Sequence, residues 1–431
     1  MVLRYIRAIF RRLNGAYPMQ HSQLYITLIL LILFAIALSS ILLIQTVSMG
    51  QVTTKTTIKN SIKVDVEVPD LSQIVKDQIQ RMSGPQFNLV PKPTARLAFL
   101  ALVHDEATVE GLYEFLDVAY LPHHYYFIHL DLKAPDSLMK NLMQSFRYHP
   151  NVVVATNRTK GEWGGLSLVN SELHLLNLAS ALNQQTEEDK RWQHAILICG
   201  NTYPSHSMKT IEERMSKFDR QANIVFSRKG LWRSCDYDPL DRYNTPIMTC
   251  GKTSGRCMDE ECTKMTGTPG NAVVYKGPQW FILSKDFTSW MFQKDTYTDK
   301  ITAWLDFHKK TFAPDEFFFP TLLMDSPFAH TWNLTGWPQP NPEQYTEEEV
   351  QPIFHRTEWF NCTTYKNSHI GKGPCSLGVD DWDKFTNEDE PALFIRKLIP
   401  GDPLKRKLYE DVFMKEDPSL LPWKDHKLPK K

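Results

Sequence analysis

The amino-acid sequence predicts an α/β domain with a mostly parallel sheet, preceded by one N-terminal transmembrane helix. Two observations lead to this prediction. An uncharged apolar segment lies near the N-terminus, and from Arg96 onward short apolar runs alternate with amphipathic stretches. Strands that alternate with helices form parallel sheets covered on both faces, and such sheets bind ligands beyond the carboxyl ends of their strands.

The first element is an apolar segment long enough to cross a bilayer. No Asp, Glu, Lys or Arg occurs from Leu13 to Thr54, and a helix of about 20 apolar residues spans the hydrocarbon core. Four arginines precede it, which favours a cytoplasmic N-terminus. A cleaved signal peptide is the alternative, but its apolar region is shorter and ends in a small-residue site. We therefore expect residues 1–23 to form a cytoplasmic tail and residues 24–45 a signal anchor.

A polar segment separates this anchor from the predicted domain. Residues 46–93 are rich in Thr, Lys, Val, Gln and Ser, are interrupted by four prolines, and include one helix-like piece near Leu71–Met82. We interpret this segment as a stem. Residues 94–425 are then expected to form the luminal domain.

The strands and helices of the domain are expected in regular alternation. The predicted strands are Leu97–Val103, Tyr125–Asp131, Val152–Ala155 and Ala195–Cys199. The predicted helices are Glu106–Tyr120, Asp136–Tyr148, Leu166–Leu182 and Met208–Phe218. After Phe226 a Cys-rich irregular stretch follows, and then an aromatic strand-like run, Gly277–Ser284, leads into a helix at Lys285–Phe292.

Polar residues follow several of these strands. His104 follows the first strand, Asp131 ends the second, and Gly200-Asn201 follows the fourth. Because the carboxyl ends of parallel strands meet at one edge, we expect these residues to converge there.

Sequons and cysteines agree with a luminal chain. Asn-x-Ser/Thr sequons occur at Asn157, Asn333 and Asn361. Cys199 ends an apolar run and is predicted to be a free thiol, which leaves six of the seven cysteines. These six are disulfide candidates in an oxidising lumen: Cys235, Cys250, Cys257, Cys262, Cys362 and Cys375. Zinc is the alternative for the Cys250–Cys262 cluster, but its spacing is poor for zinc and no His lies near it.

Two adjacent carboxylates, Asp315 and Glu316, are embedded in the apolar and aromatic run Thr311–Pro320. A carboxylate removed from water gains a pKa that suits a general base. However, Pro followed by two acids also opens many helices. From these residues alone the helix start is the favoured interpretation, with catalysis as the alternative.

Charge argues against a nucleic-acid partner. Lysine and arginine together equal aspartate and glutamate in number, so the formal net charge is zero. No basic tract of the nucleic-acid-binding kind occurs.

Several short motifs in order resemble the core-2/I-branching β-1,6-N-acetylglucosaminyltransferases and peptide O-xylosyltransferases, a family of inverting, type II membrane enzymes. The resemblance covers about residues 96 to 400 and rests on these segments: Leu97–His104, Tyr126–Ala134, Trp163–Val169, Cys199–Pro204 with Lys209-Thr210, Gly277–Ser284, Ala313–Phe319, Lys372–Asp381 and Leu393–Leu398. It implies a metal-independent fold of the GT-A (Rossmann-like) type, located in the membrane of the Golgi or of the ER and Golgi.

The resemblance also implies roles for individual residues. Glu316 would be the general base, and Asp315 would orient or cap. Lys372 and Lys397, with Arg396 as an accessory, would bind the diphosphate of a UDP-sugar. The uracil and ribose would lie near Val103, His104 and Asp131. The sugar rings would stack on Trp163, Tyr203 or Trp280, with a place in the core as the alternative for these aromatic residues. Cys362 and Cys375 are candidates for a disulfide that holds the loop presenting Lys372, although the sequence leaves the connectivity of the cysteines open.

The expected function is therefore the transfer of GlcNAc or xylose from a UDP-sugar to a hydroxyl of a glycan or glycoprotein, with no metal and no other cofactor. Two residues depart from the family pattern. Lys372 replaces an Arg, and an ammonium lacks the bidentate phosphate contact of a guanidinium. Thr202 replaces an Asp, which favours the alternative of an inactive luminal carbohydrate-binding or scaffold protein. The motifs leave the choice between GlcNAc and xylose open.

Overall fold

The structure is a computed structural model. It describes residues 72–82, 93–218, 220–225, 232–233, 236–237, 248–249, 269–272, 274–309, 311, 313–333, 354–358, 374–384 and 392–423. The predicted tail, the predicted anchor and most of the predicted stem lie outside these ranges, as do Lys372, Asn361, Cys235, Cys250, Cys257, Cys262 and Cys362. Within these ranges, no helix combines the length and hydropathy needed to cross a membrane.

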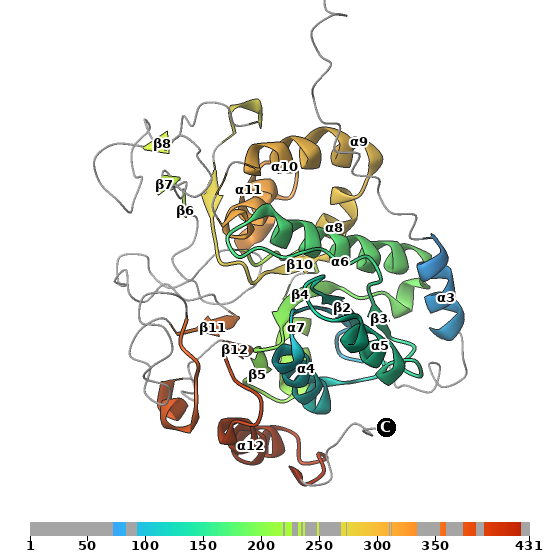
Figure 1. Ribbon diagram of the computed structural model, residues 1–431, viewed down its shortest axis with the longest axis vertical. Helices are drawn as coiled ribbons and strands as arrows, with labels where there is room; N and C mark the ends of the chain where they lie inside the picture. Colours follow the sequence, from blue (N-terminus) through green and yellow to red (C-terminus); the bar gives the residue numbers. More distant parts are fainter. Residues whose placement is uncertain are drawn as a thin grey trace, which may run out of the picture. The chain divides into compact units, whose positions relative to one another are not determined.

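A five-stranded sheet forms the centre of the described domain (Figure 1). Its strands are β1 (Leu97–Val103), β2 (Tyr125–Leu130), β3 (Val152–Val154), β4 (His194–Cys199) and β10 (Ile282–Ser284), in the order β10-β4-β1-β2-β3. The first four strands are parallel, and β10 pairs antiparallel with β4. The predicted mostly parallel α/β sheet is therefore confirmed.

Helices cover both faces of this sheet. One face packs against α4 (Glu106–Ala119), α5 (Asp136–Ser145) and α7 (Met208–Ser216), and the other packs against α6 (Leu166–Gln185), α8 (Lys285–Met291) and α11 (Phe318–Met324). Successive side chains of β1 alternate between the two cores: Leu97 and Phe99 pack with α4, whereas Ala98 and Leu100 pack with α6. Burial on both faces explains why the strands read as continuous apolar runs.

A helix in the segment that we interpreted as a stem packs against this domain. Helix α3 (Ser72–Met82) contributes the buried side chains of Val75 and Met82 to the core that contains α6. The amide of Gln78 donates to the carbonyl oxygens of Pro150 and Val152. Hydrophobic and polar contacts thus hold α3 on the domain.

A second sheet extends the domain beyond the end of β4. It consists of β11 (His355–Thr357), β12 (Phe394–Arg396) and β5 (Tyr203–Pro204); β12 pairs parallel with β11 and antiparallel with β5. Tyr203 and Ile395 of this sheet share a third core with Leu404 and Leu408 of α12 (Pro403–Leu408), whereas Phe394 packs in the core that contains α4. The second sheet therefore brings a distant C-terminal segment to the carboxyl end of β4.

Short elements complete the described structure. They are η2 (Glu188–Lys190), β6 (Trp232–Arg233), β7 (Asp236–Tyr237), β8 (Met248–Thr249), η5 (Pro269–Asn271), β9 (Tyr275–Lys276), α9 (Lys294–Thr296), η6 (Tyr297–Ile301), α10 (Thr302–His308), η7 (Pro314–Glu316), η8 (Ala329–Asn333), η11 (Val379–Lys384), η12 (Tyr409–Phe413) and α13 (Met414–Glu416).

Candidate functional site

The carboxyl ends of the central strands lie side by side, as expected for a parallel sheet. The backbone amide of Asp131 donates to the carbonyl oxygen of Val103 at 2.8 Å, and the amide of Gly200 donates to the carbonyl oxygen of Leu102 at 3.3 Å. The structure therefore brings the polar residues that follow β1, β2 and β4 to one edge.

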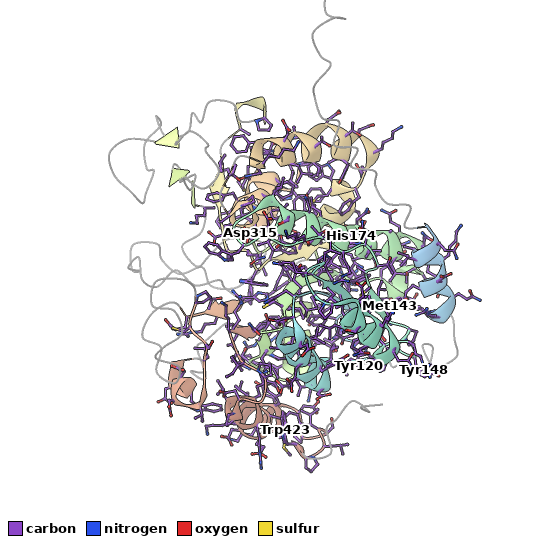
Figure 2. The ribbon with its side chains drawn as sticks, viewed as in Figure 1. Tyr120, Met143, Tyr148, His174, Asp315 and Trp423 are labelled. Atoms are coloured by element: carbon purple, nitrogen blue, oxygen red, sulfur yellow. The ribbon has the colours of Figure 1, made fainter. Side chains whose placement is uncertain are left out.

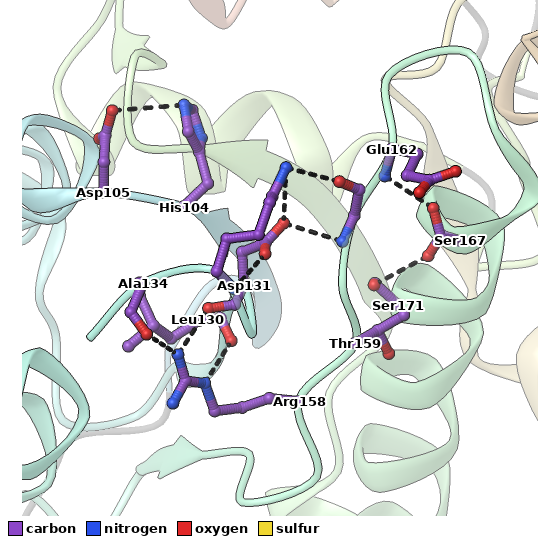
Figure 3. Close-up of polar contacts among 12 residues, drawn as sticks. His104, Asp105, Leu130, Asp131, Ala134, Arg158, Thr159, Glu162, Ser167 and Ser171 are labelled. Atoms are coloured by element: carbon purple, nitrogen blue, oxygen red, sulfur yellow. Dashed lines mark hydrogen bonds and ion pairs between the residues drawn. The ribbon is translucent and has the colours of Figure 1, made fainter. Parts of the chain in front are cut away.

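His104 is presented at this edge by the start of α4. The Asp105 side chain accepts from the amide of Thr108, and the Thr108 hydroxyl accepts from the amides of His104 and Asp105, which forms a capping box. The His104 side chain is 60% exposed, and its Nε2 lies 3.5 Å from Asp105 Oδ2 (Figure 3). The cap fixes the backbone of His104 and leaves its imidazole accessible.

Asp131 is buried and anchors the loop after β3. Its Oδ1 accepts from the amide of Lys133 at 2.7 Å, and its Oδ2 accepts from the amide of Gly161 at 2.9 Å. The Arg158 guanidinium donates to the carbonyl oxygens of Leu130, Asp131 and Ala134 (Figure 3). The Asp131 carboxylate is therefore rigidly held. A ligand can contact only the oxygen lone pairs that the two backbone amides leave free.

The loop formed by residues 159–165 connects this edge to the segment that carries Glu316. One end contacts Asp131 through Gly161, and near the other end the carbonyl oxygen of Gly164 accepts from the amide of Ala313 at 3.0 Å. Trp163 lies between these contacts and is 68% exposed. A large apolar side chain is thus displayed between the proposed nucleotide side and the proposed base.

Glu316 ends the helical turn η7, which Pro314 opens. The amide of Glu316 donates to the carbonyl oxygen of Ala313 at 2.9 Å, and its own carbonyl oxygen accepts from the amide of Gly277 at 2.8 Å. Its side chain is 32% exposed, and its Oε2 lies 3.2 Å from Nζ of Lys276. Ala313 adopts a left-handed conformation, with φ of 50°, a strained backbone state for a non-glycine residue. The Glu316 backbone is therefore fixed, and its half-buried side chain forms an ion pair with Lys276.

Asp315 points away from solvent, toward α6. It is 7% exposed, and its Oδ1 has no hydrogen-bond partner among the residues that the structure describes. Burial, reinforced by the charge of Glu316, raises the pKa of Asp315 to about 7. Figure 2 marks its position beside α6.

A second buried carboxyl group, Glu172, reaches this region from α6. It is fully buried, and its Oε1 accepts from the Gln279 amide at 2.8 Å. In the described part of the chain, its Oε2 has no hydrogen-bond partner. Burial, and secondly the charge of Asp315, raises the pKa of Glu172 well above its usual value. Sequence reasoning missed Glu172 and Lys276.

Two cations lie at the end of β12. The Arg396 guanidinium lies over the Trp280 ring, 4.0 Å from its centroid, and hydrogen-bonds to Cys199 at the end of β4. Arg396 Nε is buried and has no hydrogen-bond partner within the described ranges. Lys397 follows directly, and burial, together with the charge of Arg396, lowers its pKa. The cations therefore lie beside the carboxyl end of the central sheet, and the mostly buried Trp280 supports Arg396.

The Thr202 side chain closes the turn after β4. Its hydroxyl oxygen accepts from the amide of Cys199 at 3.1 Å, and its amide donates to the carbonyl oxygen of Cys199 at 2.9 Å. Cys199 is a free cysteine, as predicted, whereas Cys375 is disulfide-bonded; the pairing with Cys362 stays a prediction. The threonine in place of the family's acid thus has a structural role.

Tyr203 lies in the third core and is fully buried. Its ring stacks with Phe413, and Lys405 Nζ lies 5.3 Å from its centroid. The structure therefore does not bring Tyr203 to the surface with Trp163, and these two residues expected to stack on sugars lie in different environments.

Two of the three sequons fall within the described ranges. Asn157 is exposed in the loop after β3, which suits a glycosylation acceptor. Asn333 ends η8, and its side chain is not among those described.

A possible cation-binding group occurs at the opposite edge of the sheet. His123 Nε2 and His124 Nε2 lie 2.6 and 3.2 Å from the same Oε1 of Glu212. However, the amide of Leu97 donates to His124 Nδ1, so the ring proton belongs on the Nε2 that faces Glu212. Burial opposes ionisation of Glu212, but the hydrogen bonds from His123 and His124 lower its pKa to about 2. The group fits a hydrogen-bonded cluster around an ionised Glu212 better than a metal site.

Comparison with known proteins identifies the family. The family model described as "Core-2/I-Branching enzyme" matches residues 97–386, more than half of the chain. Xylosyltransferase 1 of Rattus norvegicus is 26% identical over 316 residues, which cover 72% of this chain and 34% of that protein. Xylosyltransferase 2 of Mus musculus is 27% identical over 313 residues, which cover 71% of this chain and 32% of that protein. The match thus spans about a third of the length of these curated relatives.

Among solved structures, the apo form of mouse xyloside xylosyltransferase 1 gives a TM-score of 0.29 at 10% identity, covering 69% of this chain and 97% of that one. The mannosyltransferase Ktr4p from S. cerevisiae gives a TM-score of 0.26 at 10% identity, covering 76% of this chain and 94% of that one. On the family match, which covers the central sheet and the segment of Glu316, this chain belongs to the Core-2/I-Branching enzyme family.

Proposed function

We propose that this chain is an inverting glycosyltransferase of the GT-A type that transfers a sugar from a UDP-sugar to an acceptor hydroxyl of a glycan or glycoprotein. The donor sugar is GlcNAc or xylose. The enzyme acts in the Golgi lumen as a single-pass membrane protein and needs no metal.

One observation carries this proposal. A half-open carboxylate, Glu316, and two cations, Arg396 and Lys397, project from separate elements at the carboxyl edge of one parallel sheet. Residues 159–165 join the Asp131 side of this edge to the Glu316 segment. A base and fixed positive charge are the groups that sugar transfer from a nucleotide requires.

In the reaction, Glu316 accepts the proton of the acceptor hydroxyl while the hydroxyl oxygen attacks the anomeric carbon. The bond from that carbon to the diphosphate oxygen breaks on the opposite face, and UDP leaves with the bonding electrons. Arg396 and Lys397, with Lys372 in the undescribed segment, balance the charge that develops on the diphosphate.

The remaining expected residues take supporting roles. Val103, His104 and Asp131 lie where the uridine would bind, at the ends of β1 and β2. Trp163 offers an exposed ring for a sugar, and Trp280 supports Arg396. Asp315 supports Glu316 from the buried side.

The test is turnover of UDP-GlcNAc and UDP-xylose by the purified chain, with EDTA present, in the wild type and in Glu316→Gln. We expect turnover of one donor to persist in EDTA and to fall at least about 100-fold in Glu316→Gln, since a positioned base contributes 10² to 10⁴. UDP binding, measured by calorimetry, should be unchanged.

Glu187→Gln is the matched control, because its 73% exposed side chain pairs only with nearby Lys190. Wild-type turnover by Glu316→Gln would refute the base assignment, and a strict metal requirement would refute the Arg396–Lys397 account. UDP binding without turnover of any UDP-sugar would favour the inactive scaffold, the alternative that Thr202 supports.

A further inference from the structure

Two buried carboxyl groups lie behind Glu316, and no cation among the described residues is bonded to either of them. Glu172 from α6 is fully buried, and Asp315 from η7 is 7% exposed. Each has one oxygen without a hydrogen-bond partner, Glu172 Oε2 and Asp315 Oδ1. A buried carboxylate oxygen with no donor is costly, whereas a protonated carboxyl group supplies a donor of its own.

The surrounding charges do not compensate for two buried anions. Within the described residues, the charged groups that act on Asp315 are Glu316 on its own segment and Lys276 from β9, and Lys276 forms its ion pair with Glu316. Asp315 in turn acts on Glu172, whose only hydrogen-bond donor is the neutral amide of Gln279. Two like charges in such a site do not both ionise easily.

The same elements hold the proposed base. Gln279 and the Gly277 amide that bonds to Glu316 belong to one short segment, and Asp315 directly precedes Glu316. A change in the charge of the pair therefore acts electrostatically on Glu316, which is the next residue after Asp315.

We propose that the buried carboxyl groups of Glu172 and Asp315 hold one proton between them near neutral pH and thereby set the charge beside Glu316. Glu172 is thus a positioning residue for the reaction. Its role in the reaction rests on the function proposed above, whereas the proton itself is independent of that function.

The proton has a consequence for the rate. While the pair holds it, only one negative charge lies behind Glu316. When the pH rises and the proton leaves, the second negative charge makes proton removal from the acceptor by Glu316 more favourable. Donor turnover should therefore increase through a neutral ionisation in addition to that of Glu316 itself.

The direct test is infrared difference spectroscopy of the purified full-length chain, which detects the C=O stretch of a protonated carboxyl group as the pH is varied. The wild type should lose such a band with a midpoint near 7, the value to which burial raises the pKa of Asp315. Glu172→Gln removes the competing acid and adds a donor, so the midpoint should fall by about one pH unit or more. Asp315→Asn leaves Glu172 as the single acid of the pair, so a carboxyl band should remain but titrate with a changed midpoint.

Glu187→Gln, an exposed acid, is the control and should leave the midpoint unchanged. The pH profile of turnover should shift to lower pH in Glu172→Gln, which a merely structural role would not produce. If Glu172→Gln does not fold, the titration of the carboxyl band in Asp315→Asn tests the pair instead. A wild type without a carboxyl band that titrates near neutrality, or an unshifted midpoint in Glu172→Gln, overturns the pair.

The infrared result separates this inference from the proposed function. If the band behaves as expected while Glu316→Gln keeps full turnover, the base assignment fails and the pair stands. If turnover depends on Glu316 but no band is found, the pair fails alone.

Discussion

Trp163 is an exposed aromatic residue on a loop that is fixed at both ends. Gly161 is bonded to the Asp131 carboxylate, and Gly164 is bonded to the amide of Ala313. An indole held between these anchors loses little conformational freedom when a sugar stacks on it. Its 68% exposure therefore suits binding better than core packing.

We predict that Trp163→Ala raises the KM for the acceptor about tenfold, which corresponds to about 1.4 kcal/mol, close to the value of an aromatic contact. The melting temperature should change little because the side chain is exposed. Initial-rate kinetics over a range of acceptor concentrations measure the effect. Tyr148→Ala is the control, since Tyr148 is 75% exposed and precedes β3 at the opposite sheet edge; an equal loss in both variants would contradict a specific role.

At the residue scale, the sequence predicted the polar residues at the carboxyl ends of the strands. It did not predict which residues lie next to the carboxyl groups of Glu316 and Asp315. Lys276 approaches Glu316 only through the tertiary pairing of Gly277 with η7. Glu172 left a signal: with Val169, Leu173 and Leu176 it occupies one helical stripe that is buried. A carboxyl group on an apolar stripe predicts an unusual environment, although the sequence does not name Asp315 as its neighbour.

At the element scale, the edge depends on a close approach between α4 and the end of β4. A Cβ atom on Gly200 would lie 1.9 Å from the carbonyl oxygen of Thr108, and one on Gly111 would lie 1.9 Å from that of Gly200. The obstacle in each case is backbone, which cannot rotate away. Glycine at both positions therefore lets α4 bring His104 to the edge.

We predict that Gly200→Ala destabilises the domain by about 3 kcal/mol, the upper part of the range for overpacking. Gly401→Ala is the matched comparison: Gly401 has φ of 75° but no atom within 4 Å of its Cβ position. Gly401→Ala should lower the free energy of unfolding by only about 1 to 2 kcal/mol, because of backbone strain. Urea unfolding followed by circular dichroism measures both, and equal losses would contradict the steric explanation.

The alternating strands and helices were predictable because burial on both faces gives long apolar runs with clear breaks. The predicted helix 136–148 ends earlier, at Ser145, where Phe146 caps it. The second sheet was not predictable in the same way. Its strands have two or three residues and pair Tyr203 with Ile395 and His355 with Phe394, so no local periodicity marks them.

At the scale of the whole molecule, several histidines are buried in the neutral form. Burial lowers the pKa of His124 and His129 to about 4, and that of His308 and His355 to about 3. In the unfolded chain the pKa of each of these histidines is about 6.5. In acid the unfolded chain therefore takes up protons that the folded chain does not, and the folded state loses stability.

The sign and the pH window follow from these values. A depressed histidine pKa contributes stability that is present above about 6.5 and is lost as the pH falls toward the folded value, about 4 or 3. One such histidine costs about 2 kcal/mol between pH 6.5 and 5, at 1.36 kcal/mol per unit. We therefore predict that the free energy of unfolding falls by several times that amount over this interval, as measured by urea unfolding at each pH.

The variant His308→Gln removes the contribution of one buried histidine to this pH dependence. The variant will be less stable at every pH, because His308 packs against Trp304, Phe307 and Phe318. This loss of packing is the same at both pH values, so it cancels when the free energy of unfolding at pH 5 is subtracted from that at pH 6.5. The difference should shrink by about 2 kcal/mol. His330→Gln, at an exposed position, should leave it unchanged. A pH dependence that is identical in the wild type and His308→Gln would mean that protons enter the folded domain without unfolding it, and that its core is open at this histidine.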